Sequence, residues 1–402
     1  MPLVSKNFSD IITFTRASTG TYFDSAGVLQ SAAINAPRLD YNPSTLAAQG
    51  FLIEEARTNS IRNNTMQGAV AGTPGTLPTT WGFFTSLTGL TRTLAVGTEN
   101  GISYIDVRLN GTPSAAGDYQ IFPEAATQIA ATSGQTWTQS SYYKLQAGSM
   151  TGISDFQISV VENNVSGTFL AGTFTTQPTP SASTVRGAVT RTLNNASTAF
   201  VMPGFRLVLT GAAIDITLRI GLPQLEQGAF ATSVIPTTTT ALTRSADVAS
   251  VNTLSPWFNA TAGTLFVQGI IAGGTAATFP YQAALVGANA NTDSIGIPWS
   301  ANTGTMRFVA RVGAVAQADI GVGPSKTAGS SFKVAGRYAA NDFQAAADGI
   351  LGSADTSGTL PTITALSLGG PVSFQPGASV WLQRVTYYPR ALSNAELQAI
   401  TA

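Results

Sequence analysis

The sequence contains no cysteine and no histidine, and it is poor in charge. Without histidine there is no Ser-His-Asp triad and no imidazole metal ligand, and without cysteine there is no disulfide, cysteine nucleophile or cysteine zinc site. Charged residues make up 10% of the chain, against about 25% in an ordinary soluble protein. The 20 basic and 20 acidic residues cancel, so the chain lacks the positive charge with which nucleic-acid-binding proteins neutralise phosphates. The polar surface must therefore consist mostly of Thr, Ser, Asn and Gln.

Long hydrophobic runs are also missing. No stretch approaches the roughly 18 consecutive apolar residues of a membrane-spanning helix, so we expect no membrane insertion. Residues 1–14 lack the apolar core behind basic residues that marks a signal peptide. The hydrophobic content of 44% nevertheless suffices for packed cores. At about 150 residues per domain, 402 residues predict two or three domains.

The dominant pattern is a series of short runs in which apolar and polar residues alternate, separated by clusters of Gly, Pro, Asn and Thr. The clearest runs are 156–161, 204–210, 214–222, 332–338 and 381–387. We expect 204–210 and 214–222 to be neighbouring strands. In the last run we expect Trp381 and Tyr387 to share one face, opposite Leu382. The pattern predicts an all-β fold of two β-sandwich domains of the jelly-roll type.

One short helix is predicted near the end of the chain. Ser393 and Glu396 are spaced as a capping box, in which each side chain binds the main-chain N–H of the other residue. Leu392 and Leu397 lie at the positions of a hydrophobic staple. We therefore expect a helix over about 394–400, and because it is too short to be stable alone, it should pack on the preceding strand.

The chain divides into three predicted blocks. Residues 1–60 hold a few short strands and are too few for a good core, so we expect them to serve as an attachment or interchain segment that packs on another part or subunit. Residues 61–235 and 247–402 are strand-rich and form the two sandwiches. The Thr-rich stretch 235–246 is the predicted linker between them.

Acidic residues are too few and too scattered for a convincing glycosidase pair. The chain has seven Glu, and beyond residue 226 the only one is Glu396, which belongs to the helix cap. Glu54 and Glu55 are adjacent, so in a strand they point to opposite faces. We therefore predict no catalytic site and no enzyme activity. Cofactors are not expected either, although oxygen-rich loops such as 289–293 or 341–342 leave a structural calcium ion as an open alternative.

Aromatic residues near turns are the better functional candidates, because a flat apolar ring can stack on a sugar while polar neighbours bind its hydroxyl groups. Trp81 and Trp299 flank turns and are the two tryptophans that we expect to be exposed. Asn302 and Arg307 follow Trp299 closely and supply hydrogen-bonding groups. These four residues are the predicted carbohydrate-binding residues, with core packing of the two tryptophans as the alternative.

The last block resembles a laminin-G-like domain of the concanavalin type. The segments that carry this resemblance are 263–267, 332–335, 348–349, 366–370 and 384–397. The last segment is the most specific, because a strand, the residues Arg-Ala-Leu-Ser and a short helix commonly end such domains. Enzymes of this type carry closely spaced acidic residues on one strand, and the sequence after residue 250 has no such strand. The resemblance thus favours binding or scaffolding over hydrolysis.

The rest of the chain resembles parts of bacteriophage and prophage proteins. The segments 223–233, 235–237 and 243–247 are similar to the closure of jelly-roll carbohydrate-binding modules in these proteins. The segments 14–19, 22–24, 37–38 and 52–59 are similar to a leader found in phage virion proteins. Together these resemblances cover nearly the whole chain.

The resemblance implies a phage virion structural protein, such as a tail fibre, baseplate component or head appendage. Its expected role is host attachment through weak, multivalent binding of host-surface glycans. It also implies assembly in the bacterial cytoplasm, a place on the virion surface, other virion proteins as partners and a homo-oligomer, for which we favour a trimer. Two alternatives stay open: a decoration or connector protein that no longer binds sugar, and a polysaccharide depolymerase.

Overall fold

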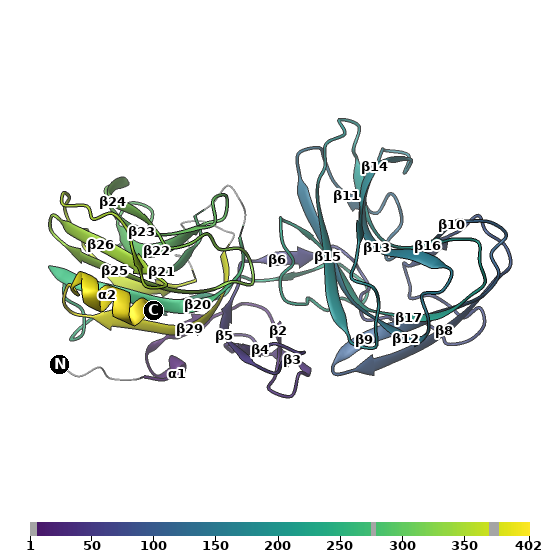
Figure 1. Ribbon diagram of the computed structural model, residues 1–402, viewed down its shortest axis with the longest axis horizontal. Helices are drawn as coiled ribbons and strands as arrows, with labels where there is room; N and C mark the ends of the chain where they lie inside the picture. Colours follow the sequence, from purple (N-terminus) through teal and green to yellow (C-terminus); the bar gives the residue numbers. More distant parts are fainter. Residues whose placement is uncertain (1–5, 275–278, 370–377) are drawn as a thin grey trace. The chain divides into compact units, whose positions relative to one another are not determined.

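The computed structural model describes residues 6–274, 279–369 and 378–402 and divides the chain into two compact units (Figure 1). One unit combines Met1–Ala56 with Ser245–Ala402, and we call it the split unit. The other is Arg57–Arg244, which we call the inserted unit. Both consist of antiparallel β-sheets, which confirms the predicted all-β class. Among the described residues, no helix has the length and hydropathy needed to cross a membrane.

The predicted separation of residues 1–60 from the last block needs correction. Strand β1 (Thr13–Thr15) pairs with β19 (Val248–Val251), and β5 (Ala48–Ile53) pairs with β29 (Ala378–Tyr388). A segment of this length cannot bury a core of its own, so its strands complete the sheets of the C-terminal sandwich. The predicted linker 235–246 also contains a strand.

That strand is β18 (Leu242–Arg244), and it pairs with β6 (Arg57–Asn59). Arg57 is the first residue of the inserted unit, Arg244 is its last, and the two are partners in this pair. The chain therefore enters and leaves the inserted unit at adjacent points. This arrangement suits a domain placed within another domain.

The inserted unit is a sandwich whose described strands form a five-stranded and a six-stranded sheet. The five-stranded sheet has the order β15 (Val185–Thr192), β12 (Thr136–Gly148), β17 (Ile214–Gln227), β9 (Ile102–Gly111) and β8 (Leu90–Glu99). The six-stranded sheet has the order β14 (Phe169–Thr176), β13 (Ile153–Asn163), β16 (Phe200–Leu209), β10 (Gly117–Phe122) and β7 (Gly82–Phe84), with β11 (Ile129–Ala130) also beside β16. The alternate residues Phe156, Ile158 and Val160 of β13 are fully buried between the sheets.

The prediction that 204–210 and 214–222 are neighbouring strands is wrong. The first lies in β16 and the second in β17, which belong to opposite sheets of the sandwich. Gly211 lies in the turn between them with a φ of 89°, in the left-handed region that glycine adopts without strain. The chain crosses from one sheet to the other at this turn, so the two strands face each other across the core instead of sharing hydrogen bonds.

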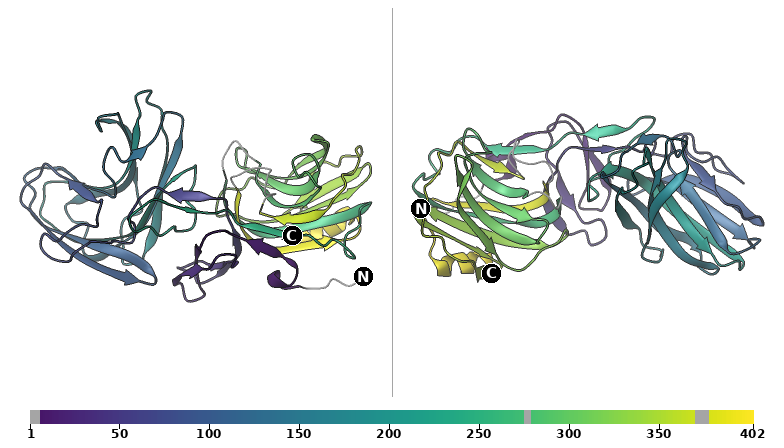
Figure 2. Two further views of the ribbon diagram at one scale, coloured as in Figure 1. Left: turned by 180° about the vertical axis from the view of Figure 1, so that it is seen from behind. Right: turned by 90° about the horizontal axis from the view of Figure 1, so that it is seen from above.

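The split unit is also a sandwich, made of two seven-stranded sheets over the described residues (Figure 2). The first has the order β1, β19, β28 (Ala365–Leu368), β21 (Tyr281–Val286), β22 (Ser294–Ser300), β23 (Thr305–Val312) and β24 (Val315–Val322). The second has the order β27 (Ile350–Leu351), β26 (Asp342–Ala347), β25 (Ser331–Ala339), β20 (Ala262–Gly274), β29, β5 and β4 (Leu39–Tyr41). A hairpin of β2 (Gly20–Phe23) and β3 (Leu29–Ala32) and the turn of helix α1 (Phe8–Ile11) complete the unit. Residue 370 of the segment 366–370 lies outside the described residues.

A β-bulge corrects the predicted faces of the strand over 381–387. Gln268 of β20 pairs with Arg384, but the next residue, Gly269, pairs with Leu382, so Gln383 is an extra residue on β29. The extra residue shifts the alternation by one position. Leu382 therefore joins Tyr387 on the core side, whereas Trp381 lies on the other side of the sheet.

Helix α2 (Asn394–Thr401) confirms the predicted helix and its cap. The Ser393 hydroxyl accepts a hydrogen bond from the Glu396 N–H at 3.3 Å, and the Glu396 carboxylate accepts one from the Ser393 N–H at 2.8 Å. Leu392 and Leu397 are both buried in one small cluster. The helix packs mainly on β25 and β26 instead of on the preceding strand β29, because Leu397 meets small side chains there, among them Ala346.

A buried ion network joins the two chain segments of the split unit. Asp247 accepts from Arg16 at 3.1 Å and from Arg38 at 2.5 Å, and Arg38 also pairs with Glu54 at 2.8 Å. Side-chain exposure in this network is at most 3%. Burial alone would lower the pKa of Arg38, but the carboxylates of Glu54 and Asp247 hold it above its usual value. Arg38 thus stays charged within the protein.

Candidate functional site

Both tryptophans that were expected to be exposed are buried. Trp81 is 8% exposed, packs against Phe205 in the core of the inserted unit and donates its indole N–H to the main-chain oxygen of Asn63 at 2.8 Å. Trp299 is 4% exposed and lies in β22 among the core residues of the split unit. Position near a turn was a poor indicator of exposure here, because both rings turn inward. Their use as sugar platforms is therefore not supported by the structure.

The structure does not bring the other two predicted residues together with Trp299 into one site. Asn302 is exposed in the turn between β22 and β23. Arg307 lies in β23 and forms an ion pair with Asp319 at 2.7 Å. Its neighbour Met306 faces the core opposite Trp299, so alternation places Arg307 on the outer face of the sheet. Trp81 belongs to the other unit.

The side-chain oxygen atoms of Asn289 and Asp293 in the loop 289–293 accept hydrogen bonds from protein groups. The Asn289 side chain accepts from the N–H of Asn291, and the Asp293 carboxylate accepts from the Thr292 hydroxyl and the Gly313 N–H. Among the described residues there is no group of three or more acidic, histidine or cysteine side chains that could hold a metal ion.

A different set of side chains forms a continuous row across the six-stranded sheet of the inserted unit. Five residues of five adjacent strands are paired in register, and they are Phe84 of β7, Gln120 of β10, Arg206 of β16, Gln157 of β13 and Thr176 of β14. At about 4.8 Å between strands, the row spans about 19 Å. We call this side of the sheet the row face.

Strand alternation explains why this row points outward. On β16, Arg206 lies between Phe205 and Leu207, which are 2% and 4% exposed in the core. Gln157 and Gln120 likewise lie between buried apolar residues on β13 and β10. Because side chains of a strand alternate between its two faces, the polar residue of each triplet must leave the core.

Arg206 is the hub of the row face. Its guanidinium pairs with Asp118 at 2.7 Å, donates to the Gln157 side-chain oxygen at 3.4 Å and lies 5.1 Å from the centre of the Phe174 ring. The side chains of Arg206 and Asp118 are 28% and 27% exposed. Both groups are thus held in place by the protein and still reach solvent.

A second carboxylate, Asp155, lies near the Thr176 end of the row. Asp155 accepts from the Gln157 amide at 2.6 Å and from the Thr176 hydroxyl at 2.7 Å. The Phe174 ring lies across Gly172, where a Cβ atom would come within 2.8 Å of the ring. Phe84, at the opposite edge, is 58% exposed. The row face therefore carries aromatic rings near both ends and polar groups between them.

This arrangement fits a ligand that presents both apolar ring faces and hydroxyl groups. Phe rings offer flat apolar surfaces, while the amides, the guanidinium and the carboxylates donate and accept hydrogen bonds. Charge-assisted hydrogen bonds donated by Arg206 and accepted by Asp118 would be the strongest of these contacts. Arg206 and Asp118 offset each other, whereas Asp155 has the neutral partners Gln157 and Thr176, so the face as a whole disfavours an anionic ligand.

The opposite outer face, on the five-stranded sheet, carries a denser network of charges. Arg219 pairs there with Asp106 at 2.7 Å and Glu99 at 2.8 Å, and Lys144 also pairs with Glu99 at 2.7 Å. The hydrogen bond from Lys144 is the main cause that lowers the pKa of Glu99. Arg219 also covers the Tyr104 ring at 3.3 Å. Arg219 and Asp106 are thus largely buried by their partners, whereas the Glu99 side chain stays 41% exposed.

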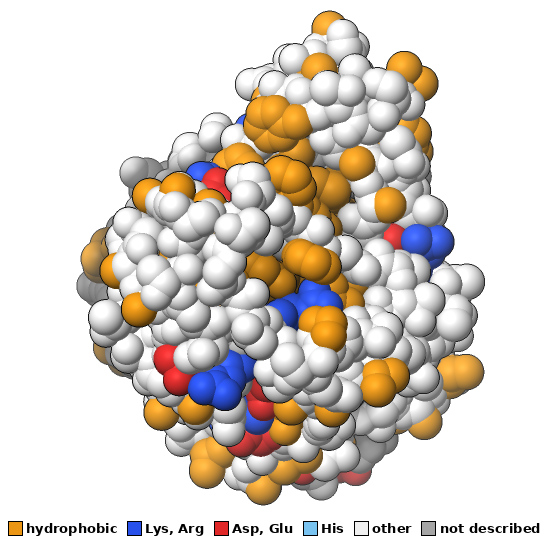
Figure 3. All heavy atoms as spheres, turned by 90° about the vertical axis from the view of Figure 1, so that its right-hand side faces the viewer, with side chains coloured by type: hydrophobic (Ala, Val, Ile, Leu, Met, Phe, Trp, Pro, Cys, Tyr) orange, Lys and Arg blue, Asp and Glu red, His pale blue; other side chains and the backbone are white. Residues whose placement is uncertain are grey.

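The surface in Figure 3 agrees with the low charge of the chain: most of it is neither charged nor hydrophobic, and hydrophobic side chains gather in one hollow. The row face was not predicted, because the candidate residues were chosen around Trp81 and Trp299 and included no Phe. The available signal was a polar residue between two large apolar ones, repeated in three strands.

No protein-family model matches the sequence, and no curated protein matches it. Similar solved structures include the CBM22-1 xylan-binding domain of Paenibacillus barcinonensis Xyn10C, which is 14% identical over 43% of this chain and 94% of that one, with a TM-score of 0.27. Domains LG4-5 of the mouse laminin α1 chain are 12% identical over 75% of this chain and 96% of that one, with a TM-score of 0.24. A Trypanosoma rangeli sialidase is 22% identical over 34% of this chain, with a TM-score of 0.26.

The chain spans only 22% of that sialidase and 32% of an α-L-arabinofuranosidase that is also similar. At these identities and TM-scores the likenesses carry no weight for function. The function proposed below therefore rests on the chain's own residues.

Proposed function

We propose that this chain is a non-enzymatic glycan-binding protein of a phage virion surface, acting in host attachment. The row face of the inserted unit is the proposed sugar-binding surface. The observation that carries the proposal is the register row from Phe84 to Thr176, with Arg206 and Asp118 fixed at its centre and Phe174 beside them. It joins apolar rings and hydrogen-bonding groups on one accessible surface.

Weak binding is expected from such a shallow face. A sheet face buries less of a ligand than a pocket does, so single-site affinity should be low. A homotrimer would present three copies, and avidity can raise weak affinity by about 10²–10⁴ when the geometry permits. The virion setting, the trimer and the other virion proteins as partners are supported by the sequence resemblance alone.

The carboxylates of the row face favour binding over hydrolysis. A glycosidase needs one carboxyl group as an acid and a second as a nucleophile or base. Asp118 is engaged by Arg206, and Asp155 is engaged by Gln157 and Thr176. Groups that are held in this way are suited to orient a sugar through its hydroxyl groups.

A glycan array tests the proposal. The full chain should be purified, its oligomeric state measured by light scattering, and the array should include bacterial surface polysaccharides. We expect binding to a subset of glycans and no released oligosaccharide after long incubation. No binding above background from a confirmed oligomer would contradict the proposal and favour a decoration or connector role. Sustained release of oligosaccharide, lost when Asp118 or Asp155 is replaced by Asn, would instead show a depolymerase.

A further inference from the structure

A β-bulge in β13 turns the side chain of Asp155 onto the row face. The register with β16 shifts by one residue between Ile153 and Asp155, so Ser154 is an extra residue on β13. Ile153 and Phe156 are 7% and 1% exposed in the core of the inserted unit. In a regular strand Ile153 and Asp155 would share a face, and the extra residue separates them. The bulge therefore places a carboxylate where alternation alone would bury it.

Asp155 belongs to a second register row, next to the row from Phe84 to Thr176. It pairs with Val208 of β16, and Val208 pairs with Asp118 of β10. At about 4.8 Å between strands, the two aspartates lie about 10 Å apart at the level of the backbone. Val208 is partly exposed between them. Two carboxylates thus flank an apolar side chain on the row face.

The protein leaves one oxygen of Asp155 free for a ligand. The Gln157 amide at 2.6 Å and the Thr176 hydroxyl at 2.7 Å both donate to Oδ2. Oδ1 accepts no hydrogen bond from the residues that the structure describes, and it reaches solvent. Both partners are neutral, so they orient the carboxylate without offsetting its charge.

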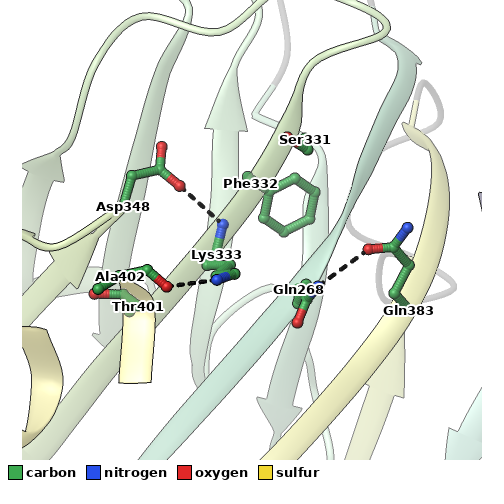
Figure 4. Close-up of a pocket in the computed structure, with 8 residues that line it drawn as sticks. All are labelled: Gln268, Ser331, Phe332, Lys333, Asp348, Gln383, Thr401 and Ala402. Carbon is green, nitrogen blue, oxygen red and sulfur yellow. Dashed lines mark hydrogen bonds between the residues drawn. The ribbon is translucent and has the colours of Figure 1, made fainter. Parts of the chain in front are cut away.

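Asp155 differs in this respect from the other carboxylates of the inserted unit, every residue of which the structure describes. Six of its eight acidic residues are ion-paired: Glu99, Asp106, Asp118, Glu124, Glu162 and Asp215. Of the other two, Glu226 is fully buried and Asp155 is partly exposed. In the split unit, Asp348 of the polar pocket in Figure 4 is likewise ion-paired, with Lys326 at 2.5 Å. Asp155 is therefore the accessible carboxylate of the inserted unit that has no basic partner.

The row face consequently carries a net negative charge. The strands of the six-stranded sheet contain four charged residues, Asp118, Asp155, Glu162 and Arg206. Glu162 is fully buried and paired with Arg191. The other three give one positive and two negative charges at the surface, and Arg206 is paired with Asp118. The group that fits Oδ1 of Asp155 best is a cation that donates hydrogen bonds, and an ammonium has three such donors.

We propose that Asp155 is a specificity-determining residue of the row face and binds the ammonium of an amino sugar whose amino group is not acetylated. This inference rests on the proposed function, because it names the sugar class of that same surface. The Phe rings and the amides bind the sugar rings, and Oδ1 of Asp155 accepts from the ammonium. A neutral sugar places a hydroxyl there instead, which donates one hydrogen bond without charge and binds more weakly.

The test compares β-linked tetramers of glucosamine, N-acetylglucosamine and glucose, which differ only in the ammonium, amide or hydroxyl at carbon 2. Binding to the full chain is measured by calorimetry at about pH 5.5, where amines are protonated and aspartates ionised. We expect the glucosamine tetramer to bind about ten-fold more tightly than the other two at low salt, with an advantage that shrinks as salt is raised. A tetramer of lysine is the fourth probe and should bind no better than the glucose tetramer, because it lacks sugar rings.

Asp155→Asn should remove the preference, so that the glucosamine tetramer binds only as well as the glucose tetramer. Asp215→Asn is the matched control, because it removes an exposed carboxylate from the other sheet of the same unit and should leave the preference intact. Val208→Lys covers the case in which Asp155→Asn fails to fold. It puts an ammonium between the two aspartates and should also abolish the preference.

Equal binding of the three sugar tetramers overturns this inference and still supports sugar binding by the chain. A preference that persists in a folded Asp155→Asn variant, an equal loss in Asp215→Asn, or equally tight binding of the lysine tetramer also overturns it. Failure of the wild type to bind the glucosamine tetramer overturns it as well, and the glycan array then decides separately on the proposed function.

Discussion

Asp247 accepts hydrogen bonds from two arginines, Arg16 and Arg38, whose side chains are not exposed to solvent. At the scale of single residues, such buried charges are the most sensitive points of this molecule. A buried ion whose partner is removed keeps its desolvation cost and loses its compensation. Exposed pairs such as Arg108 with Asp215 contribute little by comparison.

Asp247→Asn should therefore destabilise the split unit strongly. It removes a buried carboxylate that both Arg16 and Arg38 bind, so we expect the free energy of unfolding to fall by about 3–5 kcal/mol. Urea denaturation followed by fluorescence measures the change. The control is Asp319→Asn, which breaks the half-exposed pair with Arg307 and should cost about 1 kcal/mol or less. Equal losses in the two variants would contradict the account of the buried network.

The helix cap predicts a pH dependence at the end of the chain. Hydrogen bonds from Arg390 and then from Ser393 lower the pKa of Glu396 from 4.5 to about 2. Because the folded pKa is depressed, the stabilisation of α2 is present above 4.5 and is lost as pH falls toward about 2. The protection factors of the α2 amides in hydrogen exchange, corrected for the intrinsic rate at each pH, should fall over this window in the wild type. In Glu396→Gln they should already be lower at neutral pH and should lack that acid transition.

At the scale of elements, features set by local sequence were predictable and features set by distant partners were not. The α2 cap was predictable because Ser393 and Glu396 are three residues apart. Alternation also predicted the buried face of β13. The bulge at Gln383 was not predictable, because it is defined by the register with β20, more than a hundred residues earlier in the chain. For the same reason the sequence did not show that β16 and β17 lie in different sheets.

The candidate site likewise combines features that local sequence predicts with features that depend on distant strands. That Arg206 and Gln157 point outward follows from alternation within β16 and β13. That they lie side by side follows from strand pairing, which single strands do not reveal. The burial of Trp81 was not predictable either, because its partner Phe205 is far away in sequence.

Deleting Gln383 tests the role of the bulge. Without the extra residue, positions 378–382 must either shift register or turn Trp381 toward the core in place of Leu382. We expect a loss of more than about 2 kcal/mol in the free energy of unfolding, in the range of mutations that disturb a core. Gln383→Ala keeps the extra residue and should stay near the wild type. A deletion as stable as Gln383→Ala would show that the bulge does not set the faces of β29.

At the scale of the whole molecule, the chain connectivity predicts that the inserted unit folds by itself. The split unit instead needs strands from two separate segments of the chain. The inserted unit is a continuous segment whose two ends pair through β6 and β18. The split unit needs β1, β4 and β5 from the N-terminal segment, and Ile53 of β5 is 1% exposed in its core. The C-terminal part alone would leave these sheet edges and Asp247 uncovered.

Two fragments test this dependence. Residues 57–244 should fold alone and unfold cooperatively, with the far-UV circular dichroism of a β-protein. Residues 245–402 should not show a cooperative transition, because the missing strands leave apolar edges exposed. A cooperative transition of the second fragment at the temperature of the full chain would contradict the split architecture.

The central claim is that the row face binds sugar, and a comparison of two matched variants tests it most directly. Affinity for a neutral glycan identified on the array should be measured for the wild type, Arg206→Ala and Arg108→Ala. Both variants lose an arginine of the inserted unit that is paired with an aspartate, but Arg108 pairs with Asp215 on the other sheet. The account predicts that Arg206→Ala weakens binding about ten-fold or more while Arg108→Ala leaves it unchanged. Unchanged binding by a folded Arg206→Ala variant would contradict the claim.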